Sequence, residues 1–263
     1  MSQPIPMIVG DGVNDRTHCP TCGMAVRIAR RTYDNRADHY EALIYGEDVA
    51  KILPPQDPET AAKLRELRKG KKTVAFIGLA PTSCSLAPFD DPEVEIWGLN
   101  EAHAFHQWFK RADRWFQIHA TESWKRHIAK RDVRGHFDWL KKNPLDIPIY
   151  MQYPHPLVPK SIGYPLHEVV GDVFNNFRRG DMKVKYFTST FAYMMGIAFL
   201  EKFERVEIYG FELSDEIEYV KQKACAEFWI GVALGRGLEV YTPPNCQILY
   251  SELYGGSEQG AGW

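Results

Sequence analysis

The sequence predicts an α/β fold built on a doubly wound, mostly parallel sheet, with a small N-terminal appendage. From Thr73 onward, apolar runs of strand length alternate with helical segments, which favours parallel pairing through right-handed crossovers. The 263 residues are 44% hydrophobic and 25% charged, an ordinary globular composition that excludes extended disorder and collagen-like repeats. The first 70 residues differ, because a Cys-x-x-Cys pair and a proline-rich stretch precede the first apolar run.

The N-terminal segment, residues 1–70, closes with a short charged helix. The prolines of residues 53–58 stop any regular element, and residues 59–69 follow with helical composition. Gly70 is a natural C-cap for that helix. We therefore place the domain boundary near residue 70, with a Rossmann-like nucleotide-binding domain over residues 71–263.

Strands and helices alternate along this second domain. The buried helix expected at residues 189–203 is apolar nearly all round, and the helix around residues 225–233 is amphipathic and stops at Gly235 and Gly237. Residues 150–165 are rich in tyrosine and proline and predict a long irregular loop that binds a ligand or covers a site. The predicted strands are residues 73–79, 94–100, 114–119, 147–152, 206–211 and 238–242.

Cysteine usage and hydropathy indicate a soluble protein. Five cysteines, an odd number, do not look like a disulfide framework. No apolar run approaches the roughly 20 residues of a membrane span, and the N-terminus lacks the pattern of a signal peptide. We expect a cytoplasmic protein with reduced thiols and no membrane partner.

Charge is unevenly distributed along the chain. Residues 101–185 hold 15 basic and 9 acidic side chains, a net charge of +6, whereas residues 186–263 have a net charge of −6. The basic segment is a candidate surface for DNA. The alternative is a solvated surface balanced by the acidic C-terminal third.

The turn after the first predicted strand is a candidate phosphate site, because ligands of doubly wound sheets bind outside the carboxyl ends of the strands. Gly78 would let a phosphate approach the backbone, and the following residues offer hydroxyls and amides. The same turn also fits an ordinary strand-to-helix connection, because neither the G-x-G-x-x-G nor the P-loop motif is present. The candidate nucleotide-binding residues of this turn are Gly78, Ala80, Pro81, Thr82 and Ser83.

Two further elements offer groups at the same edge. Asn100 ends the second predicted strand, where its amide would bond a base or ribose, or cap the next helix. Ser189 and Thr190 begin the buried helix and offer hydroxyls and helix-end amides to phosphates. These three residues complete the predicted nucleotide site.

Histidines supply the candidate base. His155 lies between two prolines in the long loop, and its imidazole takes a proton near neutral pH. His119 ends the third predicted strand and is the second candidate, although a lone histidine there is more often structural.

The pair Cys19 and Cys22, followed by Gly23, has the spacing of a zinc knuckle. His39 is the best third ligand, with His18 or Asp38 as the fourth. A structural zinc is the favoured interpretation; a reduced pair or a redox motif are the alternatives. No Asp-x-Asp motif is present, so we predict no catalytic metal.

Residues 186–212 combine a small-residue turn, a Met-rich helix and a strand that ends in Gly-hydrophobic-acid. This segment, with the turn at residues 78–83 and the strand ending in Asn100, resembles bacterial sialyltransferases of the Campylobacter type (glycosyltransferase family 42) and Rossmann-like proteins of the MptE and DUF115 kind. The resemblance covers roughly residues 73–242 and implies a GT-A or sialyltransferase-like sheet with His155 in the place of the family's catalytic base. The segments at residues 218–222 and 227–231 are similar to bacteriophage proteins of the same build.

Three functions remain open at this point. The first is a nucleotide-sugar-dependent glycosyltransferase, encoded by a phage and acting in the host cytoplasm, with modified DNA or a nucleotide as acceptor. The second is a non-catalytic protein that binds a nucleotide or a nucleotide signal and counters a host defence. The third is a nucleic-acid-interaction protein that uses the knuckle and the basic segment.

Overall fold

A computed structural model divides the chain into two compact units, Met1–Ile52 and Leu53–Trp263. In the first unit the structure describes two strands, residues 16–18 and 25–27. In the second unit it describes residues 58–105, 109, 111–119, 135–174, 178–179, 182–183, 185–213, 217–244, 246 and 248–249.

The first unit contains an antiparallel pair of short strands, β1 (Arg16–His18) and β2 (Ala25–Arg27), in which His18 faces Ala25. The segment that joins them carries Cys19 and Cys22. These two cysteines and His39 lie outside the described residues, so the zinc site stays a prediction.

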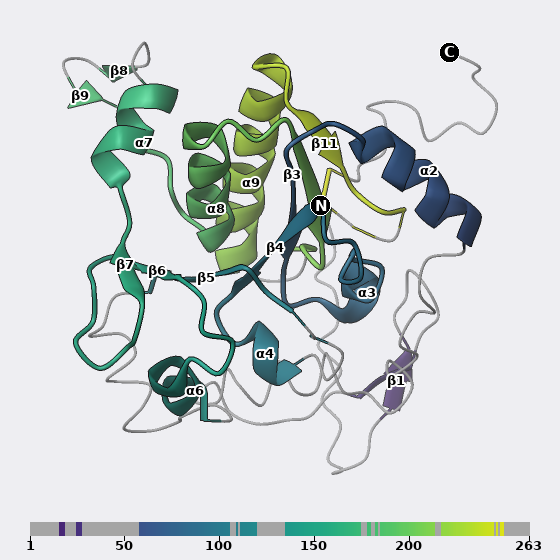
Figure 1. Cartoon of the computed structure of the whole chain (residues 1–263), viewed down its shortest axis with the longest axis horizontal. Helices are drawn as coiled ribbons and strands as arrows, with labels where there is room; N and C mark the ends of the chain where they lie inside the picture. The colour runs from purple at the N-terminus through teal and green to yellow at the C-terminus, as the bar shows by residue number, and fades with distance from the viewer. Residues whose placement is uncertain are drawn as a thin grey trace, which may run out of the picture. The chain divides into compact units, whose positions relative to one another are not determined.

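The second unit is built on a seven-stranded sheet in which every neighbouring pair is parallel, in the order β11-β10-β3-β4-β5-β6-β7 (Figure 1). The predicted α/β class is therefore confirmed. The strand order reverses at β3, which has β4 on one side and β10 on the other. The strands are β3 (Thr73–Ile77), β4 (Val94–Leu99), β5 (Arg114–Gln117), β6 (Ile149–Met151), β7 (Ser161–Gly163), β10 (Arg205–Tyr209) and β11 (Glu239–Tyr241).

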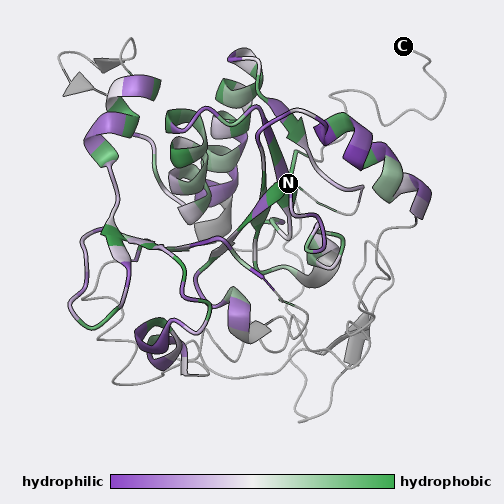
Figure 2. Cartoon of the chain, viewed as in Figure 1, coloured by the Kyte–Doolittle hydropathy of each residue, from purple (hydrophilic) through white to green (hydrophobic). Residues whose placement is uncertain are grey.

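Helices cover both faces of this sheet. On one face α7 packs on α8, and α8 packs on α9. Most of α8 is buried, and Figure 2 shows it mostly green, whereas α6 is mostly purple. The helices are α2 (Pro58–Arg68), α3 (Pro81–Cys84), α4 (Ala102–Phe105), α6 (His136–Lys142), α7 (Leu166–Val173), α8 (Thr190–Leu200) and α9 (Ile217–Gly235), and β8 (Arg178–Arg179) pairs with β9 (Met182–Lys183).

Strand β3 shows why the predicted strands are continuous apolar runs in the sequence. Val74 and Phe76 point to the face covered by α8, while Ala75 and Ile77 point to the face on which Cys84 of α3 lies. All five residues of β3 are buried. A strand buried on both faces has no polar side, so its sequence lacks the alternation of a half-exposed strand.

Strand β7 differs from the prediction. The sequence predicted an irregular loop over residues 150–165, but Ser161–Gly163 pairs in parallel with β6 at the edge of the sheet. The strand has three residues, of which Ile162 alone is a large apolar one, so no apolar run marks it.

Helix α2 belongs to the sheet unit, and the division between units falls after Ile52 rather than near residue 70. Arg68, near the end of α2, donates to both carboxylate oxygens of Glu207 on β10 at 2.9 and 2.7 Å. Leu64 is buried as well. Gly70, with φ of +74°, ends the helix as predicted.

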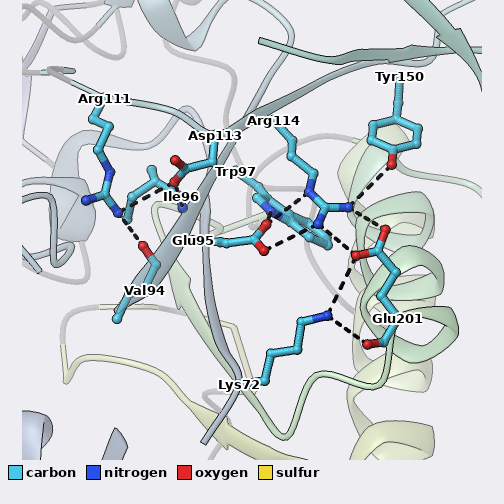
Figure 3. A network of polar contacts seen from close by, with 10 residues as sticks. All are labelled: Lys72, Val94, Glu95, Ile96, Trp97, Arg111, Asp113, Arg114, Tyr150 and Glu201. Atoms are coloured by element: carbon cyan, nitrogen blue, oxygen red, sulfur yellow. Dashed lines mark hydrogen bonds and ion pairs between the residues drawn. The ribbon is translucent and has the colours of Figure 1, made fainter. Parts of the chain in front are cut away.

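A second ion-pair network joins the elements at the amino ends of the strands (Figure 3). Arg114, the first residue of β5, donates to Glu95 at 3.0 Å and to Glu201 at 2.7 Å, and its guanidinium lies 4.8 Å from the Trp97 ring centroid. Burial alone would lower the pKa of Arg114, but the hydrogen bond to Glu201 and the two carboxylate charges outweigh it and raise the pKa. The network therefore stabilises the edge opposite the carboxyl ends of the strands.

Candidate functional site at the carboxyl edge of the sheet

The turns after β3 and β10 meet where the strand order reverses. The Gly78 amide donates to the Tyr209 carbonyl at 2.8 Å, and the Ala80 amide donates to the Gly210 carbonyl at 3.0 Å. The Gly210 amide donates to Ser83 Oγ at 2.8 Å. The two turns thus form one bonded unit at the position where doubly wound sheets bind ligands.

Gly78 is required by backbone packing. A Cβ atom there would lie 2.1 Å from the Gly210 carbonyl oxygen, too close for any residue but glycine without a shift of the backbone. Backbone packing therefore accounts for glycine at this position without a ligand, and the phosphate role of Gly78 stays a prediction.

Ser83 and Ala80 of the same turn hydrogen-bond to neighbouring residues of the fold. Ser83 is buried and its Oγ accepts from Gly210, while the Ala80 carbonyl accepts the Cys84 thiol proton at 2.9 Å. Pro81 and Thr82 begin α3, and their side chains lie outside the described part.

Asn100 carries the first group in this region that has no partner among the described residues. It is 9% exposed and follows β4 with a φ of +46°, an uncommon conformation for a residue other than glycine. Its backbone amide donates to the Phe116 carbonyl at 3.0 Å, and its backbone carbonyl accepts from Trp115 Nε1 at 3.0 Å. Side-chain Oδ1 is buried and has no hydrogen-bond partner among the described residues.

Ser189 carries the second such group. It occupies the N-cap of α8 with an extended φ of −146°, but its side chain makes no capping bond. Its Oγ is buried without a partner in the part of the chain that the structure describes. Thr190 begins the helix, and the next residue, Phe191, packs edge-on against Phe76 of β3 with centroids 5.7 Å apart.

These contacts bring two predicted binding elements to one edge. Phe191 also packs on Phe211, just after β10, with ring centroids 5.1 Å apart, so the first turn of α8 lies over the ends of β3 and β10. Asn100 follows β4, the strand next to β3 and about 5 Å from it. Buried polar atoms rarely lack a partner, and those that do call for an explanation such as a ligand.

His155 lies elsewhere. Its amide donates to Ser161 Oγ at 2.9 Å, and Ser161 is the first residue of the edge strand β7. Its imidazole lies edge-on to Phe137 at 5.9 Å, and Nδ1 accepts from the Leu157 amide at 3.2 Å. Three strand spacings, roughly 14 Å, separate β7 from β4, which Asn100 follows, and four, roughly 19 Å, separate it from β3, so the structure does not bring His155 together with Asn100 and Ser189.

Sequence reasoning missed a histidine cluster at the carboxyl ends of β4 and β5. His103 Nε2 lies 2.8 Å from His136 Nδ1, and His136 Nε2 lies 2.9 Å from Gln117 Oε1. Gln117 Nε2 approaches His119 Nδ1 at 3.4 Å. The sequence analysis singled out His119, and the strand end at residue 100 could have pointed to His103, but no local signal predicts a partner on α6.

Burial controls the ionisation of this cluster. Burial lowers the pKa of His103 to about 4. Burial, together with the charges of His103 and His119, lowers the pKa of His136 to about 3. Glu101, next to Asn100, shows the opposite direction, because burial raises the pKa of its carboxyl group. Burial thus favours the neutral form of all three groups, and perturbed pKa values of this kind are common at functional sites.

The remaining partner predictions rest on segments described in part. In the described part of the chain, no group of three His, Cys, Asp or Glu side chains is placed to hold a metal ion. The basic segment contributes β8 and β9, whose side chains lie outside the description, so the DNA surface stays a prediction. No helix of the described residues is long and apolar enough to cross a bilayer.

Comparison with known proteins gives one structural likeness. No protein-family model matches the chain, and no curated protein matches it in sequence. The structure is similar, with a TM-score of 0.39 and 11% sequence identity over 66% of this chain and 81% of the other, to the sialyltransferase CstII from Campylobacter jejuni, solved in complex with a substrate analogue, cytidine-5'-monophosphate.

Proposed function

We propose that the chain is a nucleotide-sugar-dependent glycosyltransferase that binds its nucleotide at the carboxyl edge of the sheet, between the end of β4 and the N-terminus of α8. The observation that carries this proposal is the pair of buried polar atoms, Asn100 Oδ1 and Ser189 Oγ, that have no partner among the described residues. A phage origin and a DNA or nucleotide acceptor are the finer parts of the proposal, and they rest on the sequence alone.

The two groups suit different parts of a nucleotide. The amide of Asn100 has an acceptor and two donors, which matches the edge of a base or the hydroxyls of a ribose. Ser189 lies beside the first free amides of α8, a helix of 11 residues whose dipole favours an anion at this end. A phosphate there would accept hydrogen bonds from both the amides and the hydroxyl.

Transfer would follow by positioning and proton removal. The acceptor hydroxyl gives its proton to a base as its oxygen bonds the sugar carbon, and the bond from that carbon to the phosphate breaks, leaving the electron pair on the nucleotide. His155 remains the base that the sequence proposes. It would have to reach the nucleotide from β7, so the catalytic half of the proposal needs its own test.

Calorimetry tests the binding half. We would titrate the chain with the mono- and diphosphates of cytidine, uridine, adenosine and guanosine. Asn100→Gly removes the side-chain amide and tolerates φ of +46°, and Ser189→Ala removes the hydroxyl. Each change should weaken binding roughly 10-fold, since each deletes about one net hydrogen bond.

Thr73→Val is the matched control, because it removes a buried hydroxyl at the start of β3, at the opposite edge of the sheet. Undiminished binding in both site variants would contradict the proposal.

Turnover is then assayed with nucleotide sugars that carry the bound base. As a general base, His155 should contribute at least about 100-fold to turnover, so His155→Ala should reduce it by that factor. Binding without any turnover favours the non-catalytic alternative.

A further inference from the structure

The donor and acceptor of each hydrogen bond in the histidine cluster follow from the chemistry of Gln117. The Gln117 side-chain carbonyl Oε1 can only accept, so His136 Nε2, 2.9 Å away, carries a proton. A neutral imidazole has one N–H, and therefore His136 Nδ1 is an acceptor. His103 Nε2, 2.8 Å from it, must donate. By the same count, Nδ1 of His103 holds a bare lone pair.

The ring that bears this lone pair is held in place. His103 stacks on Trp139 with ring centroids 4.1 Å apart and planes 5° from parallel, and it lies 5.9 Å from the Trp115 ring. No described residue hydrogen-bonds Nδ1 of His103, and the side chain as a whole is only partly buried. The described part of the protein thus holds Nδ1 as an oriented acceptor.

Its charge state is fixed as well. The pKa of about 4 keeps His103 neutral at physiological pH, as burial disfavours the imidazolium. Hydrogen bonds link it to His136 on α6 and, through Gln117, to His119 after β5. A neutral ring in one tautomer accepts from a donor and repels other lone pairs.

We propose that Nδ1 of His103 accepts a hydrogen bond from a sugar hydroxyl of the nucleotide ligand, and that His136 and Gln117 are positioning residues that set this tautomer. The inference rests on the proposed function. His103 lies three residues after Asn100, at the same edge of the sheet, and on the face covered by α6.

The chemistry of the two faces sets the orientation of the ligand. An ionised phosphate offers only acceptors, so it is repelled by the lone pair of His103 and attracted by the amides of α8. A hydroxyl can donate to His103. The phosphates therefore lie toward α8 and the sugar toward α6.

Nitrogen NMR of the full chain, labelled with 15N-histidine, tests the proposal. In the ligand-free protein, His103 should show an unprotonated Nδ1 and a protonated Nε2. Saturation with the ribonucleoside monophosphate chosen by calorimetry should shift Nδ1 of His103, and the 2′,3′-dideoxy form should not. If the transferred sugar supplies the hydroxyl instead, the shift appears with the nucleotide sugar alone. Inorganic phosphate should leave Nδ1 unchanged.

Variants give an independent readout. His103→Gln retains a donor toward His136 but lacks an acceptor at the Nδ1 position, so the affinity for the hydroxyl-bearing ligand should fall roughly 10-fold. The affinity for the dideoxy form should stay. His136→Phe should let the His103 tautomers mix, a change in the NMR signature that simple loss of packing would not cause. His167→Gln, an exposed histidine of α7, is the matched control.

The outcomes separate the two proposals. A nucleotide and a nucleotide sugar that both saturate the protein without shifting Nδ1 of His103 would overturn this inference alone. Equal affinity of His103→Gln for the hydroxyl-bearing and dideoxy forms, at the parent's values, would overturn it too. If no member of the calorimetric panel binds, the proposed function has failed, and this inference fails with it.

Discussion

The hydroxyl of Ser189 illustrates how a residue can weaken a fold and still be retained. A serine at an N-cap usually bonds a free amide of the first turn, and its replacement by alanine then costs about 1 kcal/mol. Ser189 makes no such bond, and its Oγ is buried without a partner among the described residues. In the ligand-free protein, no hydrogen bond from a described residue offsets the desolvation cost of burying that oxygen.

We therefore expect Ser189→Ala to raise the free energy of unfolding of the ligand-free protein by about 1 kcal/mol, as removal of an unsatisfied buried group relieves its desolvation. Urea titration measures it. Thr73→Val should have the opposite sign, because the Thr73 hydroxyl donates to the Lys71 carbonyl at 3.1 Å. A stability loss in Ser189→Ala would show that the hydroxyl is satisfied in solution.

Gly78 gives a second prediction at the scale of one residue. Gly78→Ala places Cβ 2.1 Å from the Gly210 carbonyl oxygen, which must move, and we expect a loss of about 2 kcal/mol or more. Gly231→Ala is the control, since a Cβ on this α9 residue meets nothing within 4 Å and should stabilise the helix by roughly 0.5–1 kcal/mol. Equal unfolding midpoints for the two variants would contradict the packing argument.

At the scale of single elements, the sequence predicted β3, β4 and β10 well because their apolar runs are buried on both faces. It missed β7, whose three residues carry too little apolar character to form a run. For the candidate site it predicted Asn100 and Ser189 from their places at a strand end and a helix start, and one buried polar atom of each has no partner among the described residues. It could not find the His103–His136 pair, because only the tertiary fold brings these two histidines within hydrogen-bonding distance.

The zinc prediction concerns the segment between β1 and β2. These strands pair antiparallel on either side of the residues that include Cys19 and Cys22. We expect purified protein to contain close to one equivalent of zinc and Cys19→Ser to lose it. Elemental analysis of both proteins measures this. Cys225→Ala, at a buried thiol of α9, should retain the metal. A parent protein that is free of metal and as thermally stable as the zinc-containing protein would contradict the prediction.

Helix α2 gives a prediction that depends on pH. Burial would raise the pKa of Glu207, but the hydrogen bond and charge of Arg68, helped by Arg205 and Tyr209, lower it below its usual value. A carboxyl group with a lowered pKa in the folded state contributes stability above its unfolded pKa, about 4.3, and loses it as the pH falls through the folded value.

Arg68→Met leaves Glu207 buried with one arginine fewer, and we expect a loss of about 3 kcal/mol at pH 7. The pKa of Glu207 should rise, so acid unfolding should begin at a higher pH than in the parent. Lys63→Met is the control, because the ion pair of Lys63 with Glu59 is exposed and should contribute little. An unchanged free energy of unfolding in Arg68→Met would show that α2 does not belong to the sheet unit.

Over the whole sheet unit, the two edges differ in how their polar groups are paired. At the amino edge Arg114 pairs with two carboxylates, although Arg111 Nε is buried there without a described partner; the carboxyl edge holds Asn100 Oδ1 and Ser189 Oγ, buried without a partner among the described residues, and the neutral histidine pair. Functional sites commonly carry such unfavourable groups, which the rest of the fold must offset. The carboxyl edge should therefore be the acid-sensitive part of the protein.

The histidine pair sets the direction of that sensitivity. The pKa values of His103 and His136, about 4 and about 3 in the folded state, lie below the ordinary value of 6.5 that applies when the chain unfolds. Between these values the unfolded chain binds more protons than the folded one, so stability falls as the pH falls from about 6.5 toward 3.

The variant His136→Gln tests this dependence, because glutamine can hydrogen-bond but does not take up a proton in this pH range. It should flatten the dependence of unfolding free energy on pH across this window. Urea titrations at half-unit pH intervals measure the slope, and His167→Gln, on the exposed face of α7, should leave it as in the parent. A slope in His136→Gln equal to that of the parent would mean that the pKa of His136 is not lowered in the folded protein, and that burial does not keep this histidine neutral across the window.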